Sequence, residues 1–172
     1  IDPSELGKNV DIDLSLTGDA SYVLQAVLPH VKEAKHTDWM DQIHAWQAMD
    51  YKPVDSDTEL KPHQIINEIC EQAGPEAVYV TDVGQHQMWA AQFFTTDEPK
   101  HFITSGGLGT MGFGLGAAMG AAASDPAGRP VALVTGDGSF RMNLTELSTI
   151  GYYGIPVIVV IFNLSLIHIS EP

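Results

Sequence analysis

Short, largely apolar runs recur after residue 76, at Ala77–Thr81, Val131–Thr135 and Ile155–Phe162. Such runs, rich in β-branched side chains and bounded by turn residues, are typical of parallel strands that are covered on both faces. The segments between them show helical periodicity, most clearly over Pro62–Ala73, or are rich in Gly and Ala, as in the segment that ends at Ser124. This alternation of strands and helices predicts an α/β fold with a doubly wound parallel sheet.

Composition and turn signals divide the chain into three parts. We predict that residues 1–30 are the end of a preceding α/β domain, with a short strand at Leu14–Asp19 and a helix over Ala20–Leu28. Residues 31–60 are charged and end in a turn-rich stretch, which predicts a helical linker. Residues 61–163 contain the predicted sheet, and we expect them to form an incomplete second domain.

The charge balance excludes several classes of ligand. The chain has 8 Lys+Arg against 22 Asp+Glu, a net charge of −14, with 44% hydrophobic residues. Such a protein is expected to be folded, and to bind neither nucleic acid nor an anionic membrane. A phosphate-bearing ligand would have to be held by backbone N–H groups and a metal ion. The single Cys70 excludes an intrachain disulfide and favours a reducing, cytoplasmic location.

Some polar residues are expected to serve the helices themselves. In the linker, only two of four candidate metal ligands would share a helical face, which favours a solvated helix; the four are His36, Asp38, Asp41 and His44. Asn143 and Glu146 have the spacing of a capping box, which predicts a helix beginning after Asn143.

The Gly-rich segment has two alternative interpretations. Ser105–Ser124 is uncharged and long enough to span a bilayer, but its Gly and Ala content favours a tightly packed helix instead. Gly107–Gly112 matches the dinucleotide fingerprint G-x-G-x-x-G. A dinucleotide site also needs an acidic residue about 20 positions later, at the end of the next strand. Asp125 lies in a turn before that strand, which disfavours a dinucleotide site.

Three glycine-containing loops each follow a predicted strand and precede a predicted helix, at Asp82–His86, Gly106–Met111 and Gly136–Ser139. The carboxyl ends of parallel strands meet at one edge of a sheet, where ligands bind. Glycines let the backbone approach a ligand, and helix N-termini present free N–H groups to phosphate oxygens. Asp137 can bind Mg²⁺, which bridges two phosphates. The sequence therefore predicts a diphosphate site without a basic cradle.

The same loops carry a resemblance to a known family. Gly136–Ser139, read with Asn163, resembles the thiamine-diphosphate motif, which opens with Gly-Asp-Gly and closes with a pair of asparagines. Asp82–Gln92 and Ser105–Leu115 resemble the large, catalytic subunit of acetolactate synthase (acetohydroxyacid synthase). The resemblance covers the end of the central domain, the linker and the first part of the C-terminal cofactor domain.

The resemblance implies a role for individual residues. Residues that would contact thiamine diphosphate are Gly84, Gln85 and His86 at the diphosphate end, Gly109 and Met111 at the aminopyrimidine, and Asp137, Gly138, Ser139 and Asn163 around the phosphates and Mg²⁺. Met111 would hold the cofactor in its bent form. Asp137 would be the metal ligand, while Asp19 and Ala20 would contact FAD.

The activity implied by the resemblance is the decarboxylating condensation of two 2-ketoacids, pyruvate with pyruvate or 2-ketobutyrate, in branched-chain amino-acid biosynthesis. The implied cofactors are thiamine diphosphate, Mg²⁺ and FAD. The implied partners are the 2-ketoacids, further catalytic subunits in a homodimer or tetramer, and a regulatory subunit, in a bacterial-type cytoplasm. Two alternatives stay open: another thiamine-diphosphate decarboxylase or carboligase, or a non-catalytic interaction module.

The chain departs from the family pattern at two places. Gly116 stands where the family usually has proline, and Leu164 stands where the second asparagine is expected. We interpret residues 164–172 as a non-native tail. The chain begins at Ile1, and we expect it to be a fragment. The activating glutamate is expected on the N-terminal domain of a partner subunit, so no catalytic residue is assigned and the isolated chain is predicted to be inactive.

Overall fold

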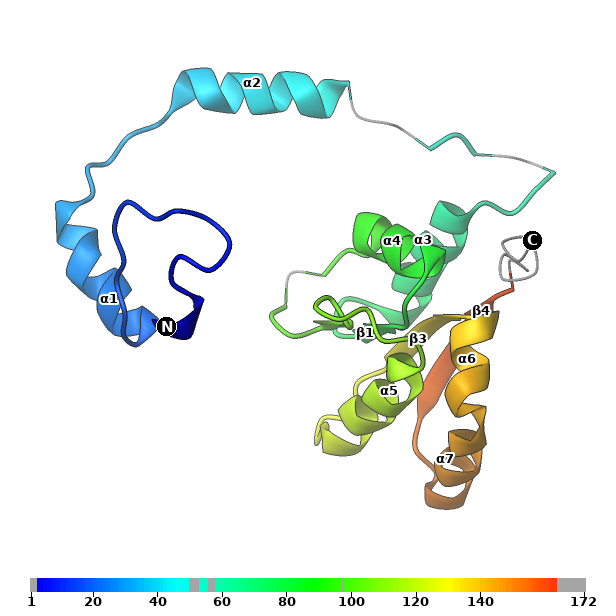
Figure 1. Ribbon diagram of the computed structural model, residues 1–172. Helices are drawn as coiled ribbons and strands as arrows, with labels where there is room; N and C mark the ends of the chain where they lie inside the picture. The colour runs from blue at the N-terminus through cyan, green and yellow to red at the C-terminus, as the bar shows by residue number, and fades with distance from the viewer. Residues whose placement is uncertain (1–2, 50–52, 56–57, 97, 164–172) are drawn as a thin grey trace, which may run out of the picture. The chain divides into compact units, whose positions relative to one another are not determined.

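The computed structural model describes residues 3–49, 53–55, 58–96 and 98–163 (Figure 1). The chain divides into two compact units, Ile1–Lys52 and Pro53–Pro172. The predicted boundaries at residues 30, 60 and 163 stay predictions, and each unit is described by itself.

The first unit is helical. It contains α1 (Ala20–Val27) and α2 (Thr37–Ala48), with short 3-10 turns at Pro3–Glu5 and Leu28–His30. All of its described residues are exposed or half-buried, so the described part of this unit has no buried core. The predicted strand at Leu14–Asp19 is wrong, because these residues form no strand. An extended run of this length is stable only when neighbouring strands take up its backbone hydrogen bonds.

The second unit alternates helices and strands along the chain. In order they are α3 (Pro62–Ala73), β1 (Val78–Thr81), α4 (Gln85–Phe93), β2 (Phe102–Ile103), α5 (Phe113–Ser124), β3 (Val131–Gly136), α6 (Asp137–Asn143), α7 (Leu147–Tyr153) and β4 (Val157–Phe162). A 3-10 turn, Leu144–Glu146, separates α6 from α7. The four strands are parallel and lie in the order β2-β1-β3-β4. This arrangement confirms the predicted α/β class with a parallel sheet.

Helices cover both faces of this sheet, as Figure 1 shows, with α3 and α4 on one side and α5, α6 and α7 on the other. Alternate residues of β1 point to opposite faces, so Val78 and Val80 pack in the cluster with α5. Tyr79 lies between them in sequence and packs with α3 residues on the opposite face. The central strand β3 is buried from Val131 to Thr135. The unbroken apolar runs therefore follow from burial on both faces.

The strand register determines where along the strand direction each loop leaves the sheet. Val78 of β1 pairs with Val131 of β3, and Gly136 at the end of β3 pairs with Phe162 at the end of β4. The residues that follow these strands thus leave the sheet at its carboxyl edge. Among the residues that the structure describes, no helix is long and apolar enough to cross a membrane.

Candidate functional site

All three predicted loops lie at the carboxyl edge of the sheet. The first follows β1 and leads into α4, which begins at Gln85. The second follows β2 and leads into α5. The third is very short, because α6 begins at Asp137, directly after the last residue of β3. Three helix N-termini, where backbone N–H groups lack intrahelical partners, are therefore collected at one edge.

Asp82 joins the first loop to the second. Its carboxylate is 1% exposed and accepts three backbone hydrogen bonds. Oδ1 accepts from the N–H of Val83 at 2.9 Å and from that of Gly112 at 2.8 Å, and Oδ2 accepts from Gly114 at 3.2 Å. Asp82 therefore caps α5, a helix that begins about thirty residues later in the chain. The sequence analysis missed this role, because an aspartate after a strand is expected to cap the helix that follows it directly.

Ser139 joins the third loop to the first. Its hydroxyl donates to the carbonyl of Val83 at 3.0 Å, and the residue is 2% exposed. The side chain predicted to contact phosphate is thus engaged within the protein, while its backbone N–H stays in the first turn of α6. Whether this residue contacts a phosphate stays a prediction.

His86 fills the space between the first and third loops. Its ring is 3% exposed. A Cβ atom placed on Gly84 would lie 2.9 Å from Cε1 of His86, and one placed on Gly136 would lie 3.0 Å from it. Both loops can approach the imidazole this closely only because these positions are glycine.

The environment of His86 favours the neutral form of its imidazole. Burial lowers its pKa, and the charge and backbone of Asp82 oppose this effect only in part. Its Nε2 atom is buried and has no hydrogen-bond partner in the described protein. A buried polar atom without a partner is rare in native proteins, so this atom is a candidate contact for a ligand or an ordered water.

The other predicted site residues lie at the same edge. Those that are exposed are Gly84, Gln85, Gly109, Met111 and Asn163, while Asp137 and Gly138 are half-buried. Gly109 has φ +63°, a backbone conformation that favours glycine. Their positions agree with a shared ligand, but none of their individual roles is tested by the structure.

The metal ligand set is incomplete in the described residues. Asp137 and Asn163 follow the paired residues Gly136 and Phe162, which brings the two polar side chains to neighbouring positions on the sheet edge. No group of three or more His, Cys, Asp or Glu side chains that could hold a metal occurs among the described residues. Leu164 lies outside the described residues, and its side chain has no donor atom for Mg²⁺.

The predicted FAD contacts belong to the first unit. Asp19 precedes α1, and its Oδ1 accepts from the N–H groups of Ser21 and Tyr22 at 3.0 and 3.2 Å. Ala20 is the first residue of that helix, and both residues are exposed. The structure therefore assigns Asp19 a capping role and does not test the FAD contact.

Further hydrogen bonds hold the second loop in place. Thr81 Oγ1 and Gln87 Nε2 donate to Oγ1 of Thr104 at 2.7 and 2.8 Å, where β2 ends. At the start of α5, Asn143 Nδ2 donates to the carbonyl of Gly112. The predicted capping box at Asn143 is wrong, because α6 begins at Asp137 and the Asn143 side chain makes no cap hydrogen bond. Packing of α6 against α5 offers this amide a distant backbone partner instead.

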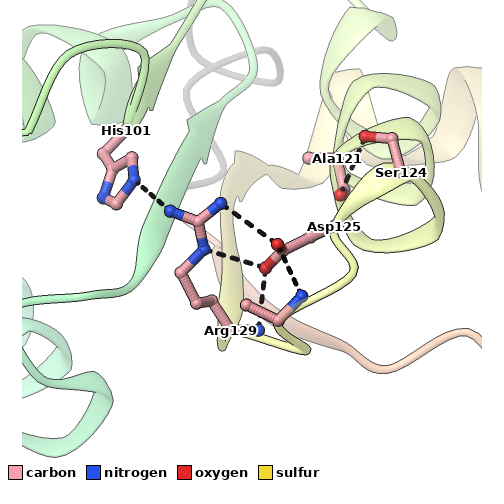
Figure 2. Close-up of polar contacts among 6 residues, drawn as sticks. His101, Ala121, Ser124, Asp125 and Arg129 are labelled. Carbon is pink, nitrogen blue, oxygen red and sulfur yellow. Dashed lines mark hydrogen bonds and ion pairs between the residues drawn. The ribbon is translucent and has the colours of Figure 1, made fainter.

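A second polar cluster lies at the opposite, amino edge of the sheet (Figure 2). Asp125 accepts from Arg129 Nε at 2.9 Å and from Nη2 at 3.1 Å, while Nη1 of Arg129 lies 2.8 Å from Nε2 of His101. The guanidinium holds the pKa of Asp125 well below its usual range. These residues precede β2 and β3, so the cluster is separate from the candidate site.

Comparison with known proteins shows what the chain is similar to. Residues 82–165 match the C-terminal TPP-binding domain of thiamine pyrophosphate enzymes. The chain is 41% identical to the acetolactate synthase large subunit of Haemophilus influenzae and 42% identical to the isozyme 3 large subunit of Escherichia coli. It is 38% identical to a probable acetolactate synthase large subunit of Methanococcus aeolicus.

Each of these alignments covers 95% of this chain and 30% of the relative, so the chain spans less than a third of the length of these relatives. The matched family region contains all three loops of the carboxyl edge. Residues 82–165 are therefore similar to the C-terminal domain of thiamine pyrophosphate enzymes, and nearly the whole chain is similar to a segment of acetolactate synthase large subunits.

Proposed function

We propose that this chain is part of an acetolactate synthase catalytic subunit and supplies one side of its thiamine diphosphate site. The proposed reaction condenses pyruvate with a second pyruvate or with 2-ketobutyrate and releases CO2, in branched-chain amino-acid biosynthesis. The observation that carries the proposal is the convergence of the loops 82–86, 106–111 and 136–139 at one sheet edge. The relatives are named acetolactate synthases, which favours this activity over other thiamine-dependent reactions.

The residues at this edge fit a diphosphate cofactor. The buried Nε2 of His86 has no hydrogen-bond partner among the described residues, and Gly138 and Ser139 lie in the first turn of α6, where backbone N–H groups can meet phosphate oxygens. When bound, thiamine diphosphate supplies the electron sink for decarboxylation of a 2-ketoacid. The residues of this chain bind and orient it: Met111 supports the aminopyrimidine, while His86 presents an uncharged ring at the diphosphate end.

Magnesium is part of the proposal, with Asp137 as its ligand and the side chain of Asn163 beside it. A hard oxygen donor is required at the next position, and Leu164 offers none. We therefore propose that the chain as it stands binds Mg²⁺ and thiamine diphosphate weakly. Restoring the donor by Leu164→Asn should tighten binding that depends on Mg²⁺.

FAD and the subunit partners rest on the resemblance alone. No described side chain of the first unit is buried, so no orphaned polar group there points to FAD near Asp19 and Ala20. We propose assembly with further catalytic subunits, as a homodimer or tetramer, because the activating glutamate has to come from a partner. A regulatory subunit and a cytoplasmic location are proposed on the same ground.

The decisive experiment is a chimera. Residues 1–163 replace the matching segment of the E. coli isozyme 3 large subunit, so that the relative's own sequence follows Asn163. We expect this chimera to form acetolactate from pyruvate with thiamine diphosphate and Mg²⁺, whereas the 172-residue chain alone should form none. The Asp137→Ala chimera is the control, and it should lose activity because its metal ligand is missing.

Two results would contradict the proposal. One is a chimera that has a cooperative thermal transition but neither binds thiamine diphosphate nor forms acetolactate. The other is acetolactate formation by the purified 172-residue chain. The first result would favour a non-catalytic cofactor-fold module, and the second would show that no partner domain is needed.

A further inference from the structure

We propose that Asp82 is a positioning residue that sets the distance between the two halves of the cofactor site. The diphosphate half is the loop 83–86, and the aminopyrimidine half is the loop 105–112. This inference rests on the proposed function, since it assigns the two loops to opposite ends of one cofactor. Asp82 was assigned no role by the sequence motif in which it lies.

The geometry makes Asp82 a tether between the loops. It belongs by sequence to the diphosphate half, directly before Val83, whose N–H it accepts at 2.9 Å. By its other contacts it belongs to the aminopyrimidine half, because it accepts from Gly112 at 2.8 Å and Gly114 at 3.2 Å. All three bonds are made to a charged acceptor, which strengthens each of them.

Close packing leaves the tether little freedom. A Cβ atom on Gly114 would lie 3.0 Å from both Cβ and Oδ2 of Asp82 and 2.7 Å from Cδ1 of Leu133. Helix α5 can therefore reach the carboxylate only because residue 114 is glycine. Gly112 has φ +85°, so the turn that precedes the helix also depends on glycine. The carboxylate is 1% exposed, and water does not compete for these bonds.

A purely structural cap would show the same contacts, so the test has to separate stability from spacing. Asp125 provides the matched control. It also is an aspartate that accepts backbone N–H groups, from Ala127 at 3.1 Å and Arg129 at 2.8 Å, but it lies at the amino edge (Figure 2). Loss of its carboxylate charge should lower stability without changing the distance between the two cofactor loops.

The first experiment uses the 172-residue chain without cofactor. In Asp82→Asn the single amide oxygen can serve Gly112 or Gly114, but not both. We expect backbone hydrogen exchange in peptides covering residues 105–116 to become about tenfold faster, with exchange in β3 unchanged. In Asp125→Asn the faster exchange should be confined to residues around 125–130. Unchanged exchange over residues 105–116 in Asp82→Asn would overturn the proposal.

The second experiment uses the chimera and compares two ligands in the presence of Mg²⁺. Thiamine diphosphate reaches both loops, whereas inorganic pyrophosphate reaches only the diphosphate half. We expect Asp82→Asn to raise the dissociation constant of thiamine diphosphate about tenfold or more. The dissociation constant of pyrophosphate should change less than about twofold, because its contacts lie on one side of the tether. Asp125→Asn should change neither.

If Asp82→Asn does not fold, Gly114→Ala tests the same spacing, because its added methyl group pushes α5 away from an intact carboxylate. The same selective loss of thiamine diphosphate is expected. Equal weakening of both ligands, or of neither, would show that Asp82 is only a structural cap. A folded, unsubstituted chimera that binds neither ligand contradicts the proposed function instead. In that case the hydrogen-exchange experiment alone tests whether Asp82 links the two loops.

Discussion

Helix α5 has a carboxylate at each end, buried for Asp82 and half-buried for Asp125, and the two are stabilised in different ways. At its N-terminus Asp82 accepts only backbone N–H groups, and no hydrogen bond to a basic side chain is found for it among the described residues. At its C-terminus Asp125 is held by the guanidinium of Arg129. The helix dipole explains the difference, because it favours a negative charge at the N-terminus and disfavours one at the C-terminus.

This difference shows how a chain with so few basic residues can build an anion site. Helices α4, α5 and α6 follow strands β1, β2 and β3 and begin at the carboxyl edge, where their first N–H groups lack intrahelical partners. A carboxylate is stable there without a cation, and a diphosphate can be held by the same kind of donor. At the amino edge the protein needs an arginine, and the polar groups there are used for structure.

Replacing Asp82 by alanine should have the largest effect on stability. The substitution leaves buried N–H groups of Gly112 and Gly114 without an acceptor. We expect the free energy of unfolding to fall by about 3 kcal/mol. Asp125→Ala should cost less, because its turn is partly exposed and water can replace the lost acceptor. Urea unfolding followed by circular dichroism measures the free energy of unfolding of the two variants. Equal losses in the two variants would contradict this prediction.

Close packing at the carboxyl edge should appear as intolerance of a methyl group. Gly84 has φ +148°, and a Cβ atom there would lie 2.9 Å from the His86 ring. Gly84→Ala should therefore lower the free energy of unfolding by about 2 kcal/mol. Gly116→Ala is the matched control, since it lies in α5 with no atom within 4 Å of its Cβ position. That variant should gain about 0.5 kcal/mol, and a loss there would contradict the packing argument.

The smallest effect should come from the ion pair at the amino edge, and it should depend on pH. The pKa of Asp125 is below its unfolded value in the folded protein, chiefly because of its hydrogen bonds with Arg129. The carboxylate therefore contributes stability above an unfolded pKa of about 3.9, and this is lost as pH falls towards the folded pKa. Arg129→Leu removes the hydrogen bonds that lower the pKa of Asp125. The free energies of unfolding of wild type and variant should therefore differ most near neutral pH and converge in acid. Denaturant titrations from pH 7 to pH 2 test this, and a constant difference would contradict it.

Much of the fold was predicted correctly because it depends on local patterns. The predicted helix Pro62–Ala73 agrees with α3, and the apolar runs that begin at Ala77 and Val131 became β1 and β3. These runs are buried on both faces, so their apolar composition alone indicates a strand. The strand predicted at Leu14–Asp19 failed because a strand needs neighbours, and a short run of alternating residues does not reveal whether it has any.

The sequence by itself determined the α/β class and placed three glycine loops at the ends of predicted strands. Only the tertiary structure decided which polar atoms remain free for a ligand. The hydroxyl of Ser139 donates to Val83, and the carboxylate of Asp82 accepts from Gly112 and Gly114. In the part of the chain that the structure describes, Nε2 of His86 has no hydrogen-bond partner. The physical reason is that hydrogen-bond partners at a sheet edge come from segments that are distant in the chain. Strand order and register bring these segments together, and neither can be read from local periodicity.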